Sequence, residues 1–231
     1  INTMWVWIPR YTYTYLSTNT PEEIQIKFES GTNSSGTIKC TDAVTGTSTT
    51  SETCTDTINN GLKAGTSTYT HPAFWWDKND NNIRETGEEL TGIWVGKFEI
   101  SSGQIIKPNV TSLRSQRVNQ LYTGIYNMRN SGNAFGFNTT DETHMIKNME
   151  WGAIAYLSHS KYGINKEIAI NSASTFTTGC GPQSEGSTSS DSTCNAYTTA
   201  LGQSASTTGN VYGVYDMSGG AYEYVMSNMV D

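Results

Sequence analysis

The feature that most constrains the fold of this chain is a Gly-Gly pair set between aromatic runs near its end. Residues 210–225 hold four tyrosines and two acids, Asp216 and Glu223, around Gly219 and Gly220. Aromatic side chains bury large apolar areas, and glycine permits close backbone approaches that other residues do not. The pattern predicts a tight, buried turn that closes a core and leaves two acids for a specific role.

The composition suits an ordered protein with an uncharged polar surface. Charged residues make up 15% of the 231 residues, and 25 tryptophan, tyrosine and phenylalanine side chains provide material for a core. We expect a single domain over residues 1–231. The net charge of −7 and the thinly spread lysines and arginines argue against nucleic acid or an anionic membrane as a partner.

Four cysteines form two pairs of equal spacing. Cys40 and Cys54 are separated by 14 positions, as are Cys180 and Cys194, and each pair lies in a Ser/Thr/Gly-rich, core-poor insertion, at about 30–70 and 172–208. Neither spacing is typical of a zinc or redox site. We expect two local disulfides, each contributing about 3 kcal/mol, in an oxidising compartment, although crossed pairings remain open.

The ends of the sequence look like cuts. The chain begins at Ile1 without an initiator methionine and ends at Asp231 without a stop or turn signal. We therefore expect a processed product or fragment, with any targeting segment or membrane anchor outside these residues.

Hydrophobic patterning predicts short strands and two helices. Buried or half-buried strands are expected over residues 4–10, 11–15 and 23–28, and the strongest strand signal covers residues 92–100. Between 71 and 76 the chain is expected to return to the core.

One helix is expected over residues 112–129. A second should be capped by Thr140 or Asp141 and should end near Lys161 and Gly163. Together with the strands and long loops, the two helices give an α+β fold.

One polar segment fits the spacing of a calcium-binding loop. Asp77, Asn79, Asn81 and Glu88 match the oxygen-ligand spacing of such loops, with Asn82 at the usual glycine position. The flanking segments are not two helices, so a simple polar turn is the competing interpretation.

No catalytic motif stands out. His71, His144 and His159 lack metal-ligand spacing, and His71 is expected to be a packed loop residue. Trp75 and Trp76 could stack on sugar rings if exposed, with core packing as the alternative.

Several motifs resemble those of one enzyme family. Residues 209–224 read G-N-V-Y-G-V-Y-D-M-S-G-G-A-Y-E-Y and resemble the G-N-x-x-G-L-Y-D-M-x-G-N-V-W-E-W signature of the formylglycine-generating enzyme (sulfatase-modifying factor) family. Residues 148–156, 4–9 and 93–99 are similar to a helix and two strands of that family. The resemblance implies a C-type lectin-like fold with short strands and long loops.

Longer phrases are similar to a narrower group. H-P-A-F, G-I-W-V-G-K-F-E and N-M-E-W-G-A-I-A-Y-L-S-H-S-K-Y-G resemble surface proteins of gut Firmicutes, many of which look like prepilins at their N-termini. This resemblance implies an extracellular protein on the cell surface or in a pilus, whose partners would be copies of itself in a filament or a host glycan or protein ligand.

The family's structural calcium maps onto the Gly-Gly turn. Asp216, the carbonyls of Gly219 and Ala221, and Glu223 fall on its ligand positions, and such oxygens suit this hard cation. Gly220 departs from the family's asparagine, and Tyr222 and Tyr224 replace tryptophans.

The family's oxidase chemistry does not carry over. It requires redox cysteines and copper downstream of the signature, where this chain stops. We therefore expect a non-enzymatic cell-surface or pilus-type structural or adhesive module. A glycan- or protein-binding receptor domain is one alternative, and an oxidase whose catalytic cysteines are lost or lie outside this chain is another.

Overall fold

The computed structural model describes residues 2–14, 23–31, 39–41, 48–50, 68–76, 78–79, 87–184 and 194–226. It divides into two compact units, and each is described by itself. The first unit comprises Ile1–Val6, Trp94–Ile146 and Lys166–Met226, and the second comprises Trp7–Ile93, Lys147–Asn165 and Ser227–Asp231.

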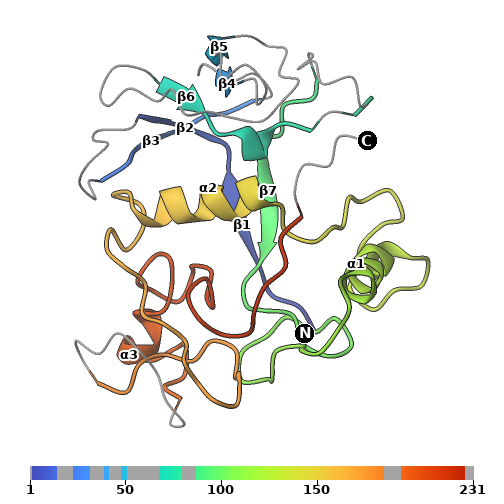
Figure 1. Cartoon of the computed structure of the whole chain (residues 1–231), viewed down its shortest axis with the longest axis vertical. Coiled ribbons are helices and arrows are strands. Elements are labelled where there is room, and N and C mark those ends of the chain that lie inside the picture. The colour runs from blue at the N-terminus through green and yellow to red at the C-terminus, as the bar shows by residue number, and fades with distance from the viewer. Residues whose placement is uncertain are drawn as a thin grey trace. The chain divides into compact units, whose positions relative to one another are not determined.

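Two predicted strands pair with each other. β1 (Trp5–Pro9) and β7 (Gly92–Gly96) form a two-stranded sheet, and the division between the units falls inside both strands (Figure 1). β7 is shorter than its apolar run because the carbonyl of Lys97 accepts a hydrogen bond from the amide of Tyr215 instead. The predicted strands are confirmed, although the strand over 92–100 ends early.

A three-stranded antiparallel sheet lies in the second unit, in the order β3-β2-β6. Its strands are β3 (Gln25–Phe28), β2 (Tyr11–Thr14) and β6 (Thr68–Thr70), and Tyr13 lies opposite both Ile26 and Tyr69. The alternation of tyrosine and threonine predicts that β2 is half-buried, which is wrong: Tyr11, Thr12 and Tyr13 are all buried. A central strand has neighbours on both edges, so even its threonine is enclosed. β4 (Lys39–Thr41) and β5 (Ser48–Thr50) form a separate antiparallel pair.

The core of the second unit is aromatic. The short 3-10 helix η1 (Pro72–Phe74) buries Phe74 completely, which confirms the predicted return to the core. The hydroxyl of Tyr11 donates a hydrogen bond of 2.6 Å to the carbonyl of Ala153 in α2 (Asn148–Ser158), so a buried phenol has its partner.

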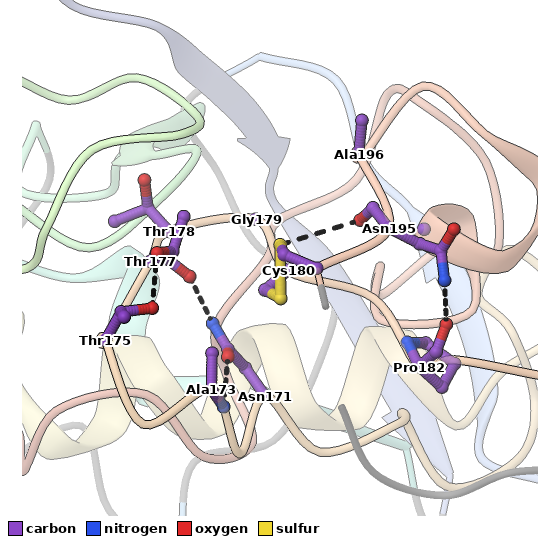
Figure 2. Close-up of a disulfide and its surroundings, with 12 residues drawn as sticks. Asn171, Ala173, Thr175, Thr177, Thr178, Gly179, Cys180, Pro182, Asn195 and Ala196 are labelled. Carbon is purple, nitrogen blue, oxygen red and sulfur yellow. Dashed lines mark hydrogen bonds between the residues drawn. A yellow bond between two sulfur atoms is a disulfide. The ribbon is translucent and has the colours of Figure 1, made fainter. Parts of the chain in front are cut away.

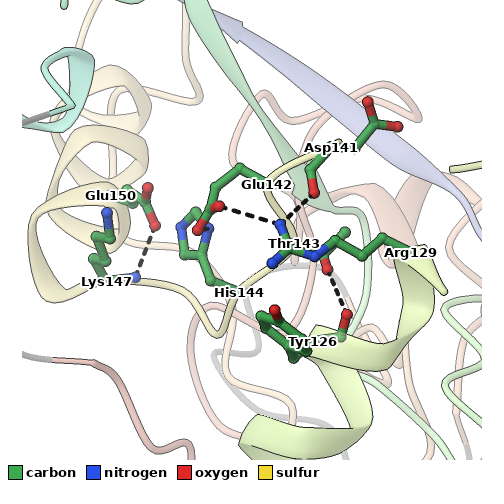
Figure 3. A network of polar contacts seen from close by, with 8 residues as sticks. All are labelled: Tyr126, Arg129, Asp141, Glu142, Thr143, His144, Lys147 and Glu150. Atoms are coloured by element: carbon green, nitrogen blue, oxygen red, sulfur yellow. Dashed lines mark hydrogen bonds and ion pairs between the residues drawn. The ribbon is translucent and has the colours of Figure 1, made fainter. Parts of the chain in front are cut away.

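α2 begins later than its sequence suggests. The predicted caps, Thr140 and Asp141, are wrong: the helix starts at Asn148, and the amide of Lys147 donates to the Glu150 carboxylate at 2.8 Å (Figure 3). Asp141 instead accepts the amide hydrogen of Asn138 at 2.7 Å and closes a local turn. The helix also ends at Ser158, three residues before Lys161. Local turn formation therefore competes successfully with helix capping here.

In the first unit, α1 covers Val118–Tyr126 and continues into η2 (Asn127–Arg129), while α3 covers Ala200–Gln203. The predicted start of α1 at residue 112 is wrong. Ser115 adopts a positive φ of 59°, which a right-handed helix excludes, and Ser112 pairs with Ser101 in a β-bridge. The core cluster of this unit contains Phe98, Ile106, Met128, Ala169, Ala205 and Tyr215.

The disulfide between Cys180 and Cys194 is formed, with a Cα–Cα distance of 4.9 Å (Figure 2). The sequence predicts a core-poor insertion around it, and the described part differs: Thr178, Cys180 and Ser206 are fully buried. A Cβ on Gly202 would overlap the carbonyl of Ala196, which shows that small residues let the backbone pack closely there. Cys54 lies outside the described residues, so its pairing with Cys40 stays a prediction. Across the described ranges, none of the helices has the length and apolar character needed to cross a membrane.

Candidate functional site

The Gly-Gly turn is held by a backbone clamp on Asn171. The amide of Asn171 donates to the carbonyl of Ser218 at 2.8 Å, and its carbonyl accepts the amide hydrogen of Gly220 at 2.6 Å. Gly219 and Gly220 adopt positive φ angles of 84° and 77°. A Cβ on Gly219 would overlap the Asn171 backbone, and one on Gly220 would overlap the Glu99 carboxylate. Both glycines are therefore required by conformation and by space.

The prediction of a buried turn is correct only for a short segment before the glycines. Val214, Tyr215 and Asp216 are buried, whereas Tyr212 before them is 77% exposed and Tyr222 after the glycines is fully exposed. Tyr224 is also 54% exposed. The aromatic pattern by itself does not distinguish the buried segment from the exposed residues around it, because tyrosine is common both in cores and on binding surfaces.

Asp216 anchors the turn through amide donors. Its carboxylate accepts hydrogen bonds from the Gly179 amide at 2.9 and 3.0 Å, from Asn171 Nδ2 at 2.9 Å and from the Glu99 amide at 3.4 Å. Asp216 is 3% exposed. Burial raises the pKa of Asp216, and the hydrogen bonds from Asn171 and Gly179 act in the opposite direction. The carboxylate thus links three separate segments of the first unit.

Glu99 completes this arrangement, and sequence reasoning did not identify it as a site residue. Its two carboxylate oxygens accept the Ala221 amide hydrogen at 2.9 and 3.1 Å, and the Ser112 hydroxyl donates to Oε2. Burial, the largest cause, raises the pKa of Glu99 to about 8, and the charges of Asp216 and Glu223 act in the same direction. The available signal was an acid inside the strongest predicted strand of the chain, residues 92–100.

Glu223 lies in the exposed part of the turn. Partial burial of its carboxyl and the charge of Asp216 raise the pKa of Glu223 to about 7, although the residue as a whole is exposed. Glu99, Asp216 and Glu223 therefore form a set of acids that interact electrostatically, which we call the acid cluster. Each member binds a proton more readily than a free carboxylic acid does.

The acid cluster does not have the geometry of a metal site as it stands. Within the described ranges, no group of three or more histidine, cysteine, aspartate or glutamate side chains is arranged to hold a metal ion. Both oxygens of Asp216 already accept amide hydrogens, so a cation would have to compete with them. Calcium at Asp216, Gly219, Ala221 and Glu223 remains a prediction.

The second calcium set is described only in part. Glu88 is buried, and its carboxylate accepts hydrogen bonds from the Trp75 indole and the Lys78 amide, both at 3.1 Å. Asn79 is described, whereas Asp77 and Asn81 lie outside the described residues. Glu88 thus links to Trp75 and Lys78, and its role as a calcium ligand stays a prediction. Trp75 is partly buried and Trp76 is 39% exposed.

The second unit buries a neutral histidine. His71 lies 5.3–6.2 Å, between ring centroids, from four aromatic rings, and its Nδ1 accepts the amide hydrogen of Ala73 at 3.3 Å. The four rings are Tyr11, Tyr13, Phe74 and Tyr156. Burial lowers the pKa of His71 to about 3. The prediction of a packed loop residue is confirmed.

Each unit also buries a cationic side chain. Arg10 is fully buried in the second unit, pairs with Glu29 at 3.2 Å and donates to the carbonyl of Leu90 at 3.0 Å. In the first unit, Lys97 is 8% exposed, and its ammonium lies 5.5–6.0 Å from the centres of three aromatic rings and donates to the carbonyl of Val211. Burial lowers the pKa of Lys97.

Comparison with known proteins adds no relative. No family model matches the chain, and neither a curated protein nor a solved structure does.

Proposed function

We propose that this chain is a non-enzymatic extracellular module of a bacterial cell surface or pilus, with a structural or adhesive role. The observation that carries the proposal is the Cys180–Cys194 disulfide, whose first cysteine is completely buried. Disulfides of this kind persist in oxidising compartments and are rare in the reducing cytosol. They also hold loop-rich segments together in surface proteins.

The hydrogen bonds that Asp216 and Glu99 accept support a structural role. Asp216 and Glu99 bind the amides of Gly179 and Ala221, so these carboxylates join loops in a unit that has little regular secondary structure. Such loop-to-loop contacts are expected of the C-type lectin-like scaffold that the sequence resemblance implies. We propose that scaffold for this chain.

Exposed aromatic residues favour ligand binding as a second candidate function. Trp94 is 63% exposed, Tyr212 is 77% exposed and Tyr222 is fully exposed. Aromatic residues are enriched at binding surfaces because one ring contributes a large contact area at low entropic cost. A receptor domain for a glycan or protein would use residues of this kind.

The location can be tested in the bacterium that produces the protein. Intact cells would be treated with a protease and with a membrane-impermeant antibody, and the cysteines would be alkylated before and after reduction. We expect surface accessibility and a blocked Cys180–Cys194 pair, with a cytosolic protein as the control for cell lysis. An intracellular protein whose Cys180 and Cys194 alkylate without reductant would overturn the proposal.

Structural calcium is part of the same proposal and has a separate test. A site with a Kd of about 10 μM would add about 2.7 kcal/mol of stability at about 1 mM calcium. Thermal melting in calcium chloride and in EDTA measures this difference. An unchanged melting temperature would remove the support for both the Asp216 and the Glu88 sets.

A further inference from the structure

One part of the chain differs in charge from the rest. Residues 101–140 contain four cationic side chains and no aspartate or glutamate, whereas the whole chain has 21 acids and 14 lysines and arginines. The four cations are Lys107, Arg114, Arg117 and Arg129. α1 and η2 lie within this stretch. This helical segment is therefore locally cationic in an acidic protein.

The exposed side of α1 is aromatic. Val118, Tyr122 and Tyr126 recur every four residues, which places them along one side of the helix, and they are 48%, 43% and 41% exposed. The rings of Tyr122 and Tyr126 are stacked, with centroids 6.0 Å apart and an interplanar angle of 23°. Ile125 packs against the core cluster of the first unit, so α1 has an inner side as well. We call the outer residues Val118, Tyr122 and Tyr126 the α1 face.

The C-terminal end of the α1 face is fixed in place. The Arg129 guanidinium lies 4.2 Å from the centre of the Tyr126 ring and donates to the carbonyl of Asp141 at 2.7 Å. The hydroxyl of Thr143 donates to the Tyr126 carbonyl at 3.1 Å, and Glu142 pairs with Arg129 at 3.4 Å (Figure 3). Tyr126 is thus held before any ligand arrives, which reduces the entropy lost on binding.

The N-terminal end supplies a cation that is exposed. Arg117 directly precedes α1 and is exposed, whereas Arg114 stacks on Phe176 at 3.9 Å. Twelve residues separate Arg117 from Arg129, which corresponds to roughly 18 Å along a helix. The two stacked rings of the α1 face therefore lie between two guanidinium groups. That of Arg117, before α1, is exposed, and that of Arg129, after α1, is partly neutralised by Glu142.

We propose that the α1 face binds an acidic polysaccharide, one that carries uronate or sulfate groups. The apolar C–H faces of sugar rings suit the exposed ring of Tyr122, which Tyr126 and Arg129 support from one side, and a guanidinium pairs with a carboxylate or sulfate through two parallel hydrogen bonds. Nucleic acid and anionic membranes require broader cationic surfaces than the few guanidinium groups beside α1 provide. As a ligand assignment, this inference deepens the adhesive role proposed above and rests on it.

The test measures binding of the purified full chain to heparin, polygalacturonate, neutral dextran, duplex DNA and phosphatidylserine vesicles, by calorimetry at low and physiological salt. We expect binding to heparin or polygalacturonate and none to dextran. The double variant Tyr122→Ala/Tyr126→Ala should weaken this binding about tenfold. Arg117→Glu should weaken it by a similar factor and reduce its dependence on salt.

Matched controls separate the α1 face from general effects. Tyr162→Ala removes a tyrosine of similar exposure, 44%, in the second unit, and Lys166→Glu reverses another exposed cation of the first unit; both should leave affinity within twofold. Unchanged melting temperatures would show that the variants fold.

Absence of polysaccharide binding would overturn the proposal, as would equal losses in the control variants or preferential binding to DNA or vesicles. Binding that depends on Arg117 and is insensitive to both tyrosines would also overturn it, because it would be electrostatic only. None of these outcomes depends on where the protein is located, so a failure here is distinguishable from a failure of the extracellular assignment.

Discussion

The two units stabilise their buried ionisable groups in different ways. In the second unit, Arg10 pairs with the oppositely charged Glu29, and His71 is neutral among aromatic rings. In the first unit, Asp216 and Glu99 take their hydrogen bonds from backbone amides, from Asn171 and from Ser112. An ion pair favours the charged state of both partners. Amide donors also favour the charged acid, but in the first unit burial outweighs them, so these acids take up protons more readily.

This difference gives the units opposite responses to pH. The folded pKa of Glu99 is about 8, above its ordinary value near 4.5, so the folded first unit holds an extra proton between these pH values. Its stability therefore falls as pH rises through that window and is greatest below it. His71 has a folded pKa of about 3 and an ordinary value of 6.5, so protons bind preferentially to the unfolded second unit between pH 3 and 6.5. Its stability falls as pH is lowered through that range.

The largest effect is expected from breaking the buried ion pair of the second unit. Arg10→Met removes the buried ion pair with Glu29 and should cost about 3–5 kcal/mol, measured by urea denaturation. Arg10→Met/Glu29→Leu removes both charges and should cost less than the single change. Arg117→Met, at an exposed position, should stay within about 0.5 kcal/mol. An equal loss in the single and double variants would show that packing of the Arg10 stem, and not charge pairing, matters.

Gly219→Ala should be the most destabilising alanine substitution at a positive-φ glycine of the first unit. The positive φ costs about 1–2 kcal/mol, and overlap with the Asn171 backbone adds a similar amount, for about 3 kcal/mol in total. Gly103→Ala is the matched control, because it shares a positive φ of 74° and has open space around it. Gly103→Ala should therefore show only the free-energy cost of the positive φ. Equal costs for the two variants would contradict the tight clamp on Asn171.

The acid sensitivity of the second unit should depend on His71. Between pH 6.5 and 3 its contribution changes stability by up to about 1.4 kcal/mol per pH unit. His71→Phe should flatten this dependence, which can be followed by hydrogen exchange of the Ala73 amide and its neighbours as a function of pH. A variant with the same acid sensitivity as the original chain would show that other groups control it.

The smallest expected effect is the loss of the alkaline slope in Glu99→Gln. The glutamine keeps a carbonyl oxygen for the Ala221 amide and cannot ionise, so the decline in stability between about pH 4.5 and 8 should be shallower. The slope should drop by less than about 1.4 kcal/mol per pH unit, because Asp216 and Glu223 share the cluster. Hydrogen exchange of the Ala221 and Gly179 amides provides the measurement. A steeper slope in the variant would reverse the assigned sign.

Short-range sequence patterns predicted the elements whose positions long-range packing does not change. The strands at β1, β2 and β3, the packed position of His71 and the Cys180–Cys194 pair were accessible from apolar runs, alternation and spacing. The α+β class follows from the same signals. Each leaves a signal within a short stretch of sequence, although several of them are completed by distant partners, as β1 is by β7.

Long-range contacts explain what the sequence did not reveal. The early end of β7 depends on Tyr215, which lies more than a hundred positions away, and the buried threonine of β2 depends on strands on both of its edges. Glu99 joins the candidate site through Ala221 and Asp216, which lie 122 and 117 positions away in the sequence. In addition, the start of α1 was missed because serine rarely signals a positive φ.

The setting of Lys97 has a consequence for covalent labelling. Its ammonium is bound to the Val211 carbonyl and surrounded by the rings of Phe98, Tyr197 and Tyr215, while Lys161 and Lys166 are exposed. An amine-reactive ester would therefore modify exposed lysines such as Lys161 and Lys166 at once and reach Lys97 when the rings separate. The rate at which Lys97 is labelled would therefore measure how often the core of the first unit opens spontaneously. No engineered reporter would be needed.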